Sequence, residues 1–189
     1  MRNTTRKPDV YVSVDVECVG PIPGPYSMLS LGAVVIGDRT KRFSVNIAPL
    51  EGATTHPDTM AWWTQNPEAY KKATTDAKSP AHAMSLFWDW LKSLPGNPVC
   101  VAYPAGFDHM FIYWYMIKFR GDCPFGFSAF DLKTAASVIL TIPFKSVSKR
   151  TMPRSWTATG MPHTHVAVED ADEQAVLAER MAGYLLGKN

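Results

Sequence analysis

Valine alternates with a second residue type along residues 10–17, and this period of two predicts a β-strand with one face packed into a core. The valines at the even positions form the core face. The opposite face carries, in order, Tyr11, Ser13, Asp15 and Glu17. The strand therefore presents two carboxylates on the side away from its own apolar face.

Asp15 and Glu17 would lie about 6.5 Å apart on that face. Two such carboxylates repel each other and are costly to remove from water unless a positive charge lies between them. A divalent cation would satisfy both, and ligands made only of oxygen favour Mg²⁺ or Mn²⁺ over zinc. The simpler alternative is an edge strand with a solvated acidic end, and the pair alone does not choose between the two.

Four more strands are expected from the pattern of apolar residues. After a turn-rich loop at 20–25, residues 28–36 and 42–47 read as strands joined by a short turn, so the first three strands form an antiparallel meander. A short apolar run at 99–103 is typical of a strand buried on both faces, and a further short strand is expected near 127–130.

Helical spacing of apolar residues occupies much of the remaining chain. The predicted helices cover residues 56–75 in pieces, 80–94, 106–119, 132–140 and 168–186. Ser79 and Pro80 are a typical cap and first helical residue. Residues 142–163 are polar and basic and predict a mobile loop. The chain is therefore expected to be an α/β protein whose mixed five-stranded sheet, an antiparallel meander plus parallel strands, is flanked by helices.

Composition adds limits rather than a function. With 189 residues, 46% hydrophobic and 19% charged, the chain is expected to be one soluble domain over residues 1–189, with 1–9 as a polar tail. Its net charge of +2 neither demands nor excludes a polyanionic partner. Cys18, Cys100 and Cys123 lack CxxC spacing, and no signal peptide or membrane-spanning run is evident. We therefore expect reduced thiols, a cytoplasmic location and no membrane association.

Further acidic residues are expected to join the pair on the first strand. Asp108 follows the fourth strand, and ligands in such sheets gather at the carboxyl ends of the strands. His165 and Asp170 would point about 140° apart on one helix, so both reach one site only if His165 lies in the loop before the helix. Alternatively, Asp170 simply suits a helix N-terminus electrostatically and His165 is a loop residue with no role.

In this order and spacing, the motifs Asp-Val-Glu at 15–17, Phe-Asp at 107–108, and His165 ahead of Asp170 resemble the DEDDh class of 3′–5′ exonucleases. The resemblance runs over nearly the whole chain and implies a ribonuclease H-like fold. It also implies a metal-dependent exonuclease that hydrolyses phosphodiester bonds at 3′ ends of single-stranded RNA or short DNA and releases nucleoside 5′-monophosphates.

The resemblance assigns roles to five residues. It implies that two Mg²⁺ or Mn²⁺ ions are bound by Asp15, Glu17, Asp108 and Asp170, and that His165 is the general base. The chemistry agrees, because two metals neutralise the phosphate, activate water and stabilise the leaving oxygen, and a histidine titrates near neutral pH. His163 is only two residues away, but His165 alone has the family's spacing to Asp170.

Residues that would contact the substrate are expected mainly in the loop that leaves the metal strand. The candidates are Gly20, Ile22, Tyr26, Ser27, Met28 and Phe107. Ile22 or Tyr26 would either pack on a base or merely anchor the loop. Two departures from common family patterns bear on substrate choice: Cys-Val-Gly stands at 18–20 where many members have Thr-Thr-Gly, and Tyr-Pro-Ala-Gly stands at 103–106 where many have His-Asn.

Other features leave alternatives open. The adjacent Trp62 and Trp63 would form a base-stacking platform or belong to the core. A basic cluster before His165 would hold phosphates or remain solvated; it comprises Lys145, Lys149, Arg150 and Arg154. The competing functions are an inactive nucleic-acid-binding module and a polymerase-associated proofreading subunit. A homodimer is permitted by the aromatic content and by analogy with the family.

Overall fold

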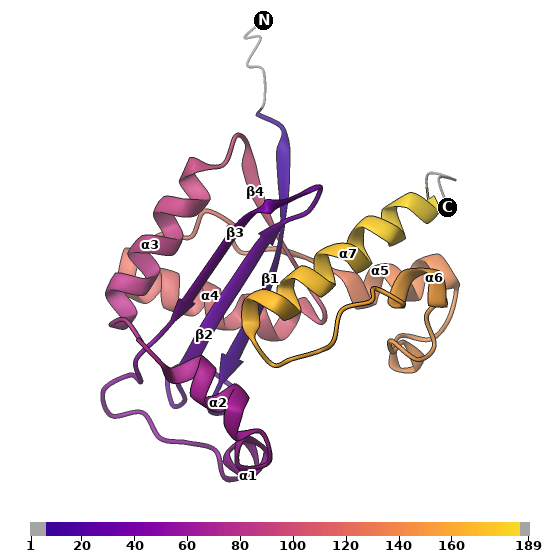
Figure 1. Cartoon of the computed structure of the whole chain (residues 1–189). Helices are drawn as coiled ribbons and strands as arrows, with labels where there is room; N and C mark the ends of the chain where they lie inside the picture. The colour runs from indigo at the N-terminus through magenta and orange to yellow at the C-terminus, as the bar shows by residue number, and fades with distance from the viewer. Residues whose placement is uncertain (1–6, 186–189) are drawn as a thin grey trace, which may run out of the picture.

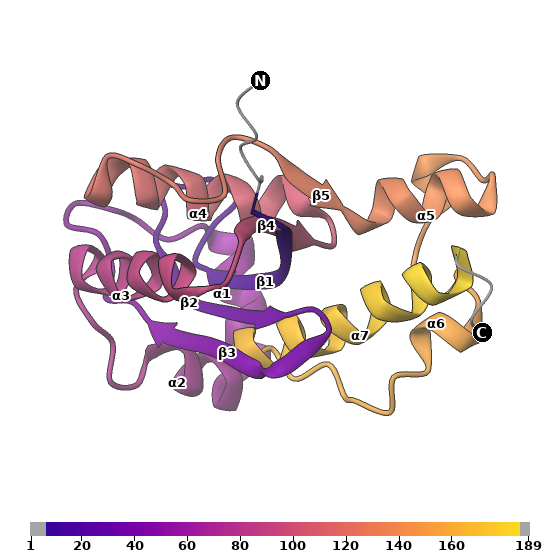
Figure 2. The ribbon, with the colours of Figure 1, turned by 90° about the horizontal axis from the view of Figure 1, so that it is seen from above.

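A computed structural model describes residues 7–185 and contains one five-stranded mixed sheet with helices on both faces (Figures 1 and 2). The strands are β1 (Asp9–Cys18), β2 (Met28–Val35), β3 (Asp38–Asn46), β4 (Asn97–Ala102) and β5 (Ala129–Asp131). Their order is β3-β2-β1-β4-β5, antiparallel in the β1–β2 and β2–β3 pairs and parallel in the other two. This confirms the expected fold class.

The expected helices are present, with small shifts at their ends, and two further short helical segments lie within residues 142–163, which were expected to form a loop. They are α1 (Pro57–Gln65), α2 (Pro67–Thr74), α3 (Pro80–Ser93), α4 (Ala105–Arg120), α5 (Leu132–Leu140), α6 (Arg154–Thr157) and α7 (Ala167–Leu185), with a 3₁₀ turn η1 at Phe144–Ser146. Ser79 caps α3 as expected, since its Oγ accepts the N–H of His82. Residues 1–6 and 186, which belong to the expected tail and last helix, lie outside the described range.

Strand β1 lies at the centre of the sheet, with hydrogen-bonded neighbours on both sides. Val12, Val14 and Val16 are at most 5% exposed and pack into the main core, which α3 and α4 complete on that side. The opposite face of β1 meets α7 (Figure 2). The alternative of an edge strand with a solvated acidic end is therefore wrong, because both edges of β1 are occupied.

The start of α7 lies directly on strand β2. A Cβ added to Gly32 would sit 2.2 Å from the backbone of Ala167 and of Val168, so a larger residue there would push the helix off the sheet. Gly32 is also the residue that faces Asp15 across the β1–β2 ladder. The absence of a side chain at this one position lets the first turn of α7 approach the carboxylates of β1.

The expectation of a mobile loop at residues 142–163 is wrong for much of that stretch. Val147, Met152 and Trp156 are at most 5% exposed and pack in a second core cluster with side chains of α5 and α7, among them Leu177. These three residues are not spaced with the period of a helix or of a strand, so no local sequence pattern predicts that they are buried. Contacts across the chain decide it.

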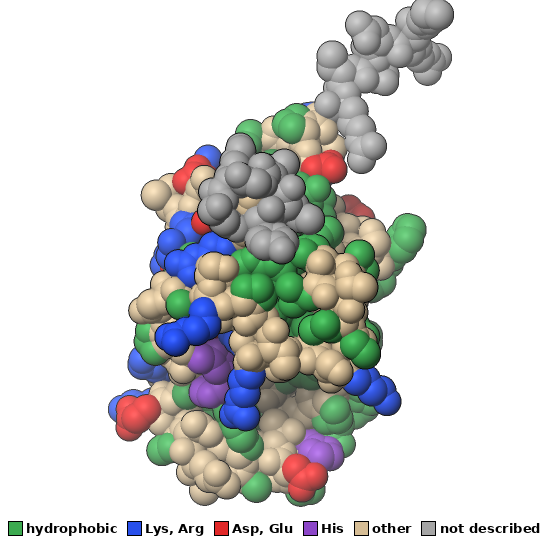
Figure 3. All heavy atoms as spheres, turned by 90° about the vertical axis from the view of Figure 1, so that its right-hand side faces the viewer, with side chains coloured by type: hydrophobic (Ala, Val, Ile, Leu, Met, Phe, Trp, Pro, Cys, Tyr) green, Lys and Arg blue, Asp and Glu red, His purple; other side chains and the backbone are tan. Residues whose placement is uncertain are grey.

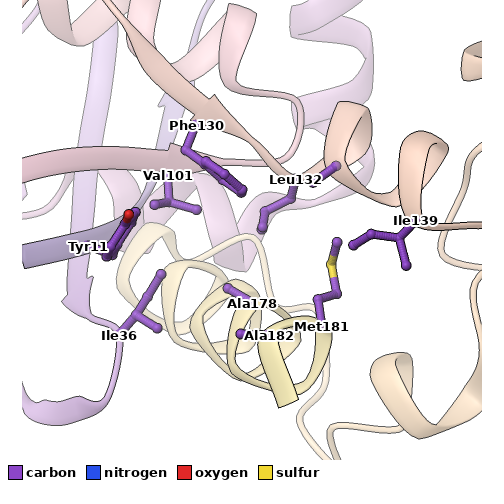
Figure 4. Close-up of a pocket in the computed structure, with 10 residues that line it drawn as sticks. Tyr11, Ile36, Val101, Phe130, Leu132, Ile139, Ala178, Met181 and Ala182 are labelled. Atoms are coloured by element: carbon purple, nitrogen blue, oxygen red, sulfur yellow. The ribbon is translucent and has the colours of Figure 1, made fainter. Parts of the chain in front are cut away.

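An apolar cavity of about 330 Å³ lies between α5, α7 and the β5 edge of the sheet (Figure 4). Tyr11, Phe130, Ile139 and Met181 are among the side chains around it (Figure 4). None of the described residues that line it is charged. The cavity therefore offers no carboxylate, imidazole or amine for acid–base or metal chemistry among these residues. Within residues 7–185, no helix combines the length and apolar character needed to cross a membrane.

Candidate active site

Carboxylates from three separate elements meet at the carboxyl end of β1. One oxygen each from Asp15, Glu17 and Asp170 lie within 4.8 Å of one another. Asp15 and Glu17 come from β1 and Asp170 from the first turn of α7 (Figure 1). Asp108, in the first turn of α4, is 4% exposed, and its Oδ1 accepts the N–H of Val16 at 3.0 Å. The structure thus brings together the four acidic residues expected to share a site.

Burial raises the pKa values of three of these groups, and repulsion between carboxylates adds to this for Asp15 and Glu17. Burial is the largest cause for Asp15, whose pKa lies well above its ordinary value, with further repulsion from Asp108, Glu17 and Asp170. The pKa of Glu17 rises to about 8, through burial and the charges of Asp170 and Asp108. Burial raises the pKa of Asp108 to about 7, although the N–H of Val16 opposes this. A cation bound between these carboxylates would favour their ionised forms at neutral pH.

Asp170 is different because it already holds the loop before α7. Its Oδ1 accepts the N–H of Thr164 at 3.0 Å and its Oδ2 accepts the N–H of His165 at 2.9 Å, while Nδ1 of His163 lies 3.1 Å from Oδ1. Burial works to raise the pKa of Asp170, but these bonds outweigh it and hold the pKa below its ordinary value. Both histidines therefore stand beside the carboxylate cluster, although the sequence pointed to His165 alone.

The ring of His165 is enclosed by aromatic neighbours. It packs edge to face against Trp62, with ring centroids 4.7 Å apart, and against His163 at 4.4 Å. Burial, together with the nearby His163, lowers the pKa of His165. Trp63 is 2% exposed and donates from Nε1 to the carbonyl of Cys18 at 2.9 Å, so this residue belongs to the core. Of the tryptophan pair, only Trp62 reaches the site.

The expected substrate residues fall into two groups. Ser27 and Met28 are at most 1% exposed, and both make hydrogen bonds inside the protein, so their side chains belong to the core. Tyr26 also anchors the loop: a Cβ on Gly20 would lie 2.2 Å from its ring, which packs edge to face on His56. Exposed apolar surface remains on Ile22, at 46%, and on Phe107, at 37%.

Gln174 and Glu173, which no sequence motif singled out, complete the site on the α7 side. Nε2 of Gln174 donates to Oδ1 of Asp15 at 3.0 Å, and Gln174 is 4% exposed. Glu173 pairs with Lys149 and lies 4.0 Å from Nδ1 of His163. A cavity of about 400 Å³ adjoins these groups and Tyr103. Gln174 follows Asp170 by four residues, which puts both side chains on one face of α7. This spacing was the one sequence feature that could have placed Gln174 in the site.

Comparison with known proteins identifies the family. The model of the 3′–5′ exoribonuclease Rv2179c-like domain matches residues 10–182. The chain belongs to this family. That range includes every acidic residue of the cluster and both histidines, and the resemblance to DEDDh exonucleases is confirmed.

Individual relatives agree with the family. The chain is 37% identical to the 3′-5′ DNA exonuclease Cap18 of Escherichia coli over 129 residues. The matched region covers 67% of each protein. In fold the chain is similar to the nuclease domain of 3′hExo, a DEDDh member bound to rAMP, with a TM-score of 0.69, 12% identity and coverage of 93% and 92%. It is also similar to Pop2p of S. pombe in a form bound to Mg²⁺ and Mn²⁺, with a TM-score of 0.65, 14% identity and coverage of 95% and 85%.

Substitution of Gln174 by alanine is expected to lower the kcat of the exonuclease about 10- to 100-fold and to weaken Mn²⁺ binding, because Asp15 loses the donor that orients its carboxylate. Isothermal titration with Mn²⁺ and steady-state kinetics measure the two effects. A Gln174→Glu variant provides a comparison: it keeps the length of the side chain but places another carboxyl group beside Asp15. A Gln174→Ala variant with the kcat and Mn²⁺ affinity of the wild type would show that Gln174 has no role in the site.

In EDTA, the Tm of the exonuclease is expected to fall as the pH rises from about 6 to about 8.5. The pKa values of Glu17, about 8, and Asp108, about 7, lie above their ordinary values, so the folded protein keeps protons that the unfolded chain has already released. Such a group stabilises the fold at low pH, and this contribution is lost as the pH rises through the folded-state pKa.

Saturating Mn²⁺ should remove most of this dependence, since a bound cation favours the ionised carboxylates. Differential scanning fluorimetry at several pH values, with and without Mn²⁺, measures both trends. A Tm in EDTA that rises through this range would mean that the carboxylates ionise freely in the folded protein.

Proposed function

We propose that this family member is a metal-dependent 3′–5′ exonuclease acting on 3′ ends of single-stranded RNA or short DNA and releasing nucleoside 5′-monophosphates. The observation that carries the proposal is the convergence of Asp15, Glu17 and Asp170 within 4.8 Å, beside the buried Asp108. Four carboxylates would repel a nucleic acid, so they suit a phosphodiester substrate only together with bound cations.

The donor set fits divalent cations of the Mg²⁺ and Mn²⁺ class. All four groups are carboxylates, the ligands these ions prefer. Burial raises the pKa values of Asp15, Glu17 and Asp108, and a bound cation would favour their ionised forms. We assign the two ions to Asp15, Glu17, Asp108 and Asp170. When bound, the ions neutralise phosphate charge, lower the pKa of the attacking water and stabilise the leaving 3′ oxygen.

His165 is assigned as the general base that accepts a proton from the attacking water. Its lowered pKa keeps the ring neutral, and therefore able to accept a proton, at pH 7. Two contacts support its position: Asp170 accepts its backbone N–H, and Trp62 packs against the ring. Its backbone lies in the left-handed region, at φ 56°, which places the residue in a sharp turn just before α7.

The terminal nucleotide is assigned to the surface between the loop at 20–25 and the start of α4. Ile22 and Phe107 supply exposed apolar area there for packing on a base. The face in Figure 3 supports a polyanionic substrate, because Lys and Arg side chains gather around a histidine while acidic side chains lie mainly toward its edges. The family is named as an exoribonuclease domain and the relative Cap18 as a DNA exonuclease, so we propose both RNA and DNA as candidate substrates.

The remaining assignments concern the whole protein. We propose that residues 1–189 act as one exonuclease domain, in keeping with the family match over 10–182. A cytoplasmic location and a homodimer stay predictions. The three cysteines are free and buried, as a reduced environment would leave them.

A time course on 5′-labelled single strands tests the proposal directly. RNA and DNA of one sequence are incubated with Mg²⁺, Mn²⁺ or EDTA, beside an Asp15→Ala variant. The expected result is a ladder that shortens from the 3′ end, with nucleoside 5′-monophosphate as product, absent in EDTA and in the variant. No shortening of either strand, together with no Mn²⁺-dependent rise in Tm, would leave a nucleic-acid-binding module without turnover.

A further inference from the structure

An apolar stripe runs along the outward face of α4, away from the carboxylates. The stripe consists of residues at helical spacing: Phe107, Met110, Trp114 and Ile117. The opposite face of the helix is buried in the core. From Met110 onward, this stripe lines a groove of about 580 Å³ together with Pro23, Tyr113 and Phe127. None of these residues belongs to the catalytic cluster, and packing of the sheet does not require their exposed area.

We propose that this groove, called here the α4 groove, binds bases of the single-stranded nucleic acid on the 5′ side of the terminal nucleotide. The inference rests on the proposed function, because it assigns a path to the strand whose 3′ end occupies the carboxylate site. Binding in the α4 groove makes the enzyme prefer substrates longer than a dinucleotide, because the aromatic side chains stack on bases whatever their identity.

Continuity with the terminal-nucleotide site is the first support. Phe107, assigned to that site, is the first residue of the stripe and immediately precedes Asp108. The loop that leaves β1 forms the other wall: Pro23 lines the groove, and a Cβ on Gly24 would lie 3.3 Å from the ring of Trp114. With a rise of about 1.5 Å per residue, Lys118 lies about 15 Å along the helix from Asp108. A strand leaving the site would reach it within a few nucleotides.

Charge is the second support. Among the described residues that line the groove there is no Asp or Glu, whereas the ammonium group of Lys118 supplies a positive charge and hydrogen-bond donors. The Nζ of Lys118 lies 4.8 Å from the centre of the Trp114 ring, so a cation stands beside the aromatic wall. Aromatic surface with an adjacent cation is the combination that single-strand binding sites use for bases and phosphates.

Exposure is the third support. Phe127 is 87% exposed, although a phenylalanine buries a large apolar area when it finds a partner. It stands at the groove on the segment between α4 and β5, which is held to the helix by the contact of His109 Nε2 with the carbonyl of Gly126 at 3.1 Å. An anchored aromatic ring at the mouth of a carboxylate-free groove suits a base as its stacking partner.

The test is the dependence of activity on substrate length in a Phe127→Ala/Lys118→Ala double variant. The matched control is Val138→Ala/Lys133→Ala on α5, where Val138 is 73% exposed and Lys133 Nζ lies 4.8 Å from the Phe144 ring. Kinetics are measured on a dinucleotide and on a strand of about 12 nucleotides, a length within the range of single-strand binding sites. Affinity for the longer strand is measured separately by fluorescence anisotropy in EDTA at several salt concentrations.

The groove variant is expected to raise KM for the longer strand about tenfold, as loss of one stacked base would do. Dinucleotide kinetics should stay within about twofold of wild type, and the slope of log K against log salt should fall by about 0.7 for one lost phosphate contact. The α5 control should match wild type on both lengths.

Equal losses on both substrate lengths, or none on either, would overturn the proposal. So would a wild-type dimer that the groove variant converts to a monomer with an unchanged length preference, since the groove would then be an interface between copies. Light scattering after size exclusion decides that point. Anisotropy in EDTA does not require turnover, so the groove is tested even if no substrate is cleaved and the exonuclease assignment itself fails.

Discussion

Replacing Asp15 by asparagine is expected to lower kcat by about a thousandfold or more and to raise the Tm of the metal-free protein at pH 8. Activity falls because a metal ligand is lost, and several kcal/mol of charge stabilisation in the transition state go with it. Stability rises because one member of a mutually repelling group becomes neutral; burial and the charges of Asp108, Glu17 and Asp170 all oppose ionisation of Asp15. Kinetics with Mn²⁺ and thermal melts in EDTA measure the two effects.

Asp172 offers a matched control two residues beyond Asp170 on the same helix. It is 5% exposed, but its charge is paired with Arg39 and Arg42, and these bonds outweigh burial and hold its pKa below the ordinary value. Asp172→Asn should therefore lower the Tm and leave kcat near that of wild type. If both variants changed stability in the same direction, the electrostatic account of the Asp15 cluster would be wrong.

Replacing His165 by alanine is expected to lower kcat about 10²- to 10⁴-fold while leaving Mn²⁺ affinity within a few-fold of wild type. The range is that of a lost general base. Metal affinity survives because the four assigned ligands are carboxylates, and because alanine retains the backbone N–H that residue 165 donates to Asp170. Steady-state kinetics and isothermal titration of the same protein samples separate the two quantities.

His163→Ala is the necessary companion variant, because both imidazoles lie close to Asp170. One ring nitrogen of each histidine and one carboxylate oxygen of Asp170 all lie within 4.8 Å of one another. The side chain of His163 is 51% exposed and contacts Asp170 directly, so its loss should have the smaller effect on kcat and the larger effect on metal affinity. The opposite pattern, with His163→Ala nearly inactive and His165→Ala nearly normal, would move the role of base to His163.

Much of the architecture is readable from local patterns. The alternation at residues 10–17 predicts β1 and the face that carries Asp15 and Glu17, because successive side chains of a strand point to opposite faces. Asp108 is expected beside this pair because the carboxyl ends of parallel strands meet at one edge of a sheet. Asp170 joins the set through the resemblance to DEDDh exonucleases. If His165 and Asp170 share one site, their separation of five residues places His165 in the loop before α7.

Contacts between distant segments are decided only by the tertiary structure. The bond from Gln174 to Asp15 joins residues far apart in the chain, and a buried Gln on α7 looks like any polar helical residue until β1 lies against it. The packing of Trp156 into the second core has the same origin, because irregularly spaced apolar residues carry no period.

What the sequence predicts and what it does not therefore depend on how far apart along the chain the interacting residues lie. The sequence by itself determined most of the strands and helices and the strand face that carries Asp15 and Glu17, because period and spacing act over a few residues. The resemblance of the motifs to DEDDh exonucleases supplied the full set of acidic residues. Only the tertiary structure decided which of two tryptophans meets His165, that His163 also reaches Asp170, and that Gln174 orients Asp15. Each of these depends on how elements pack against one another, and Gly32 illustrates the point: its missing side chain lets α7 bring Asp170 onto the sheet.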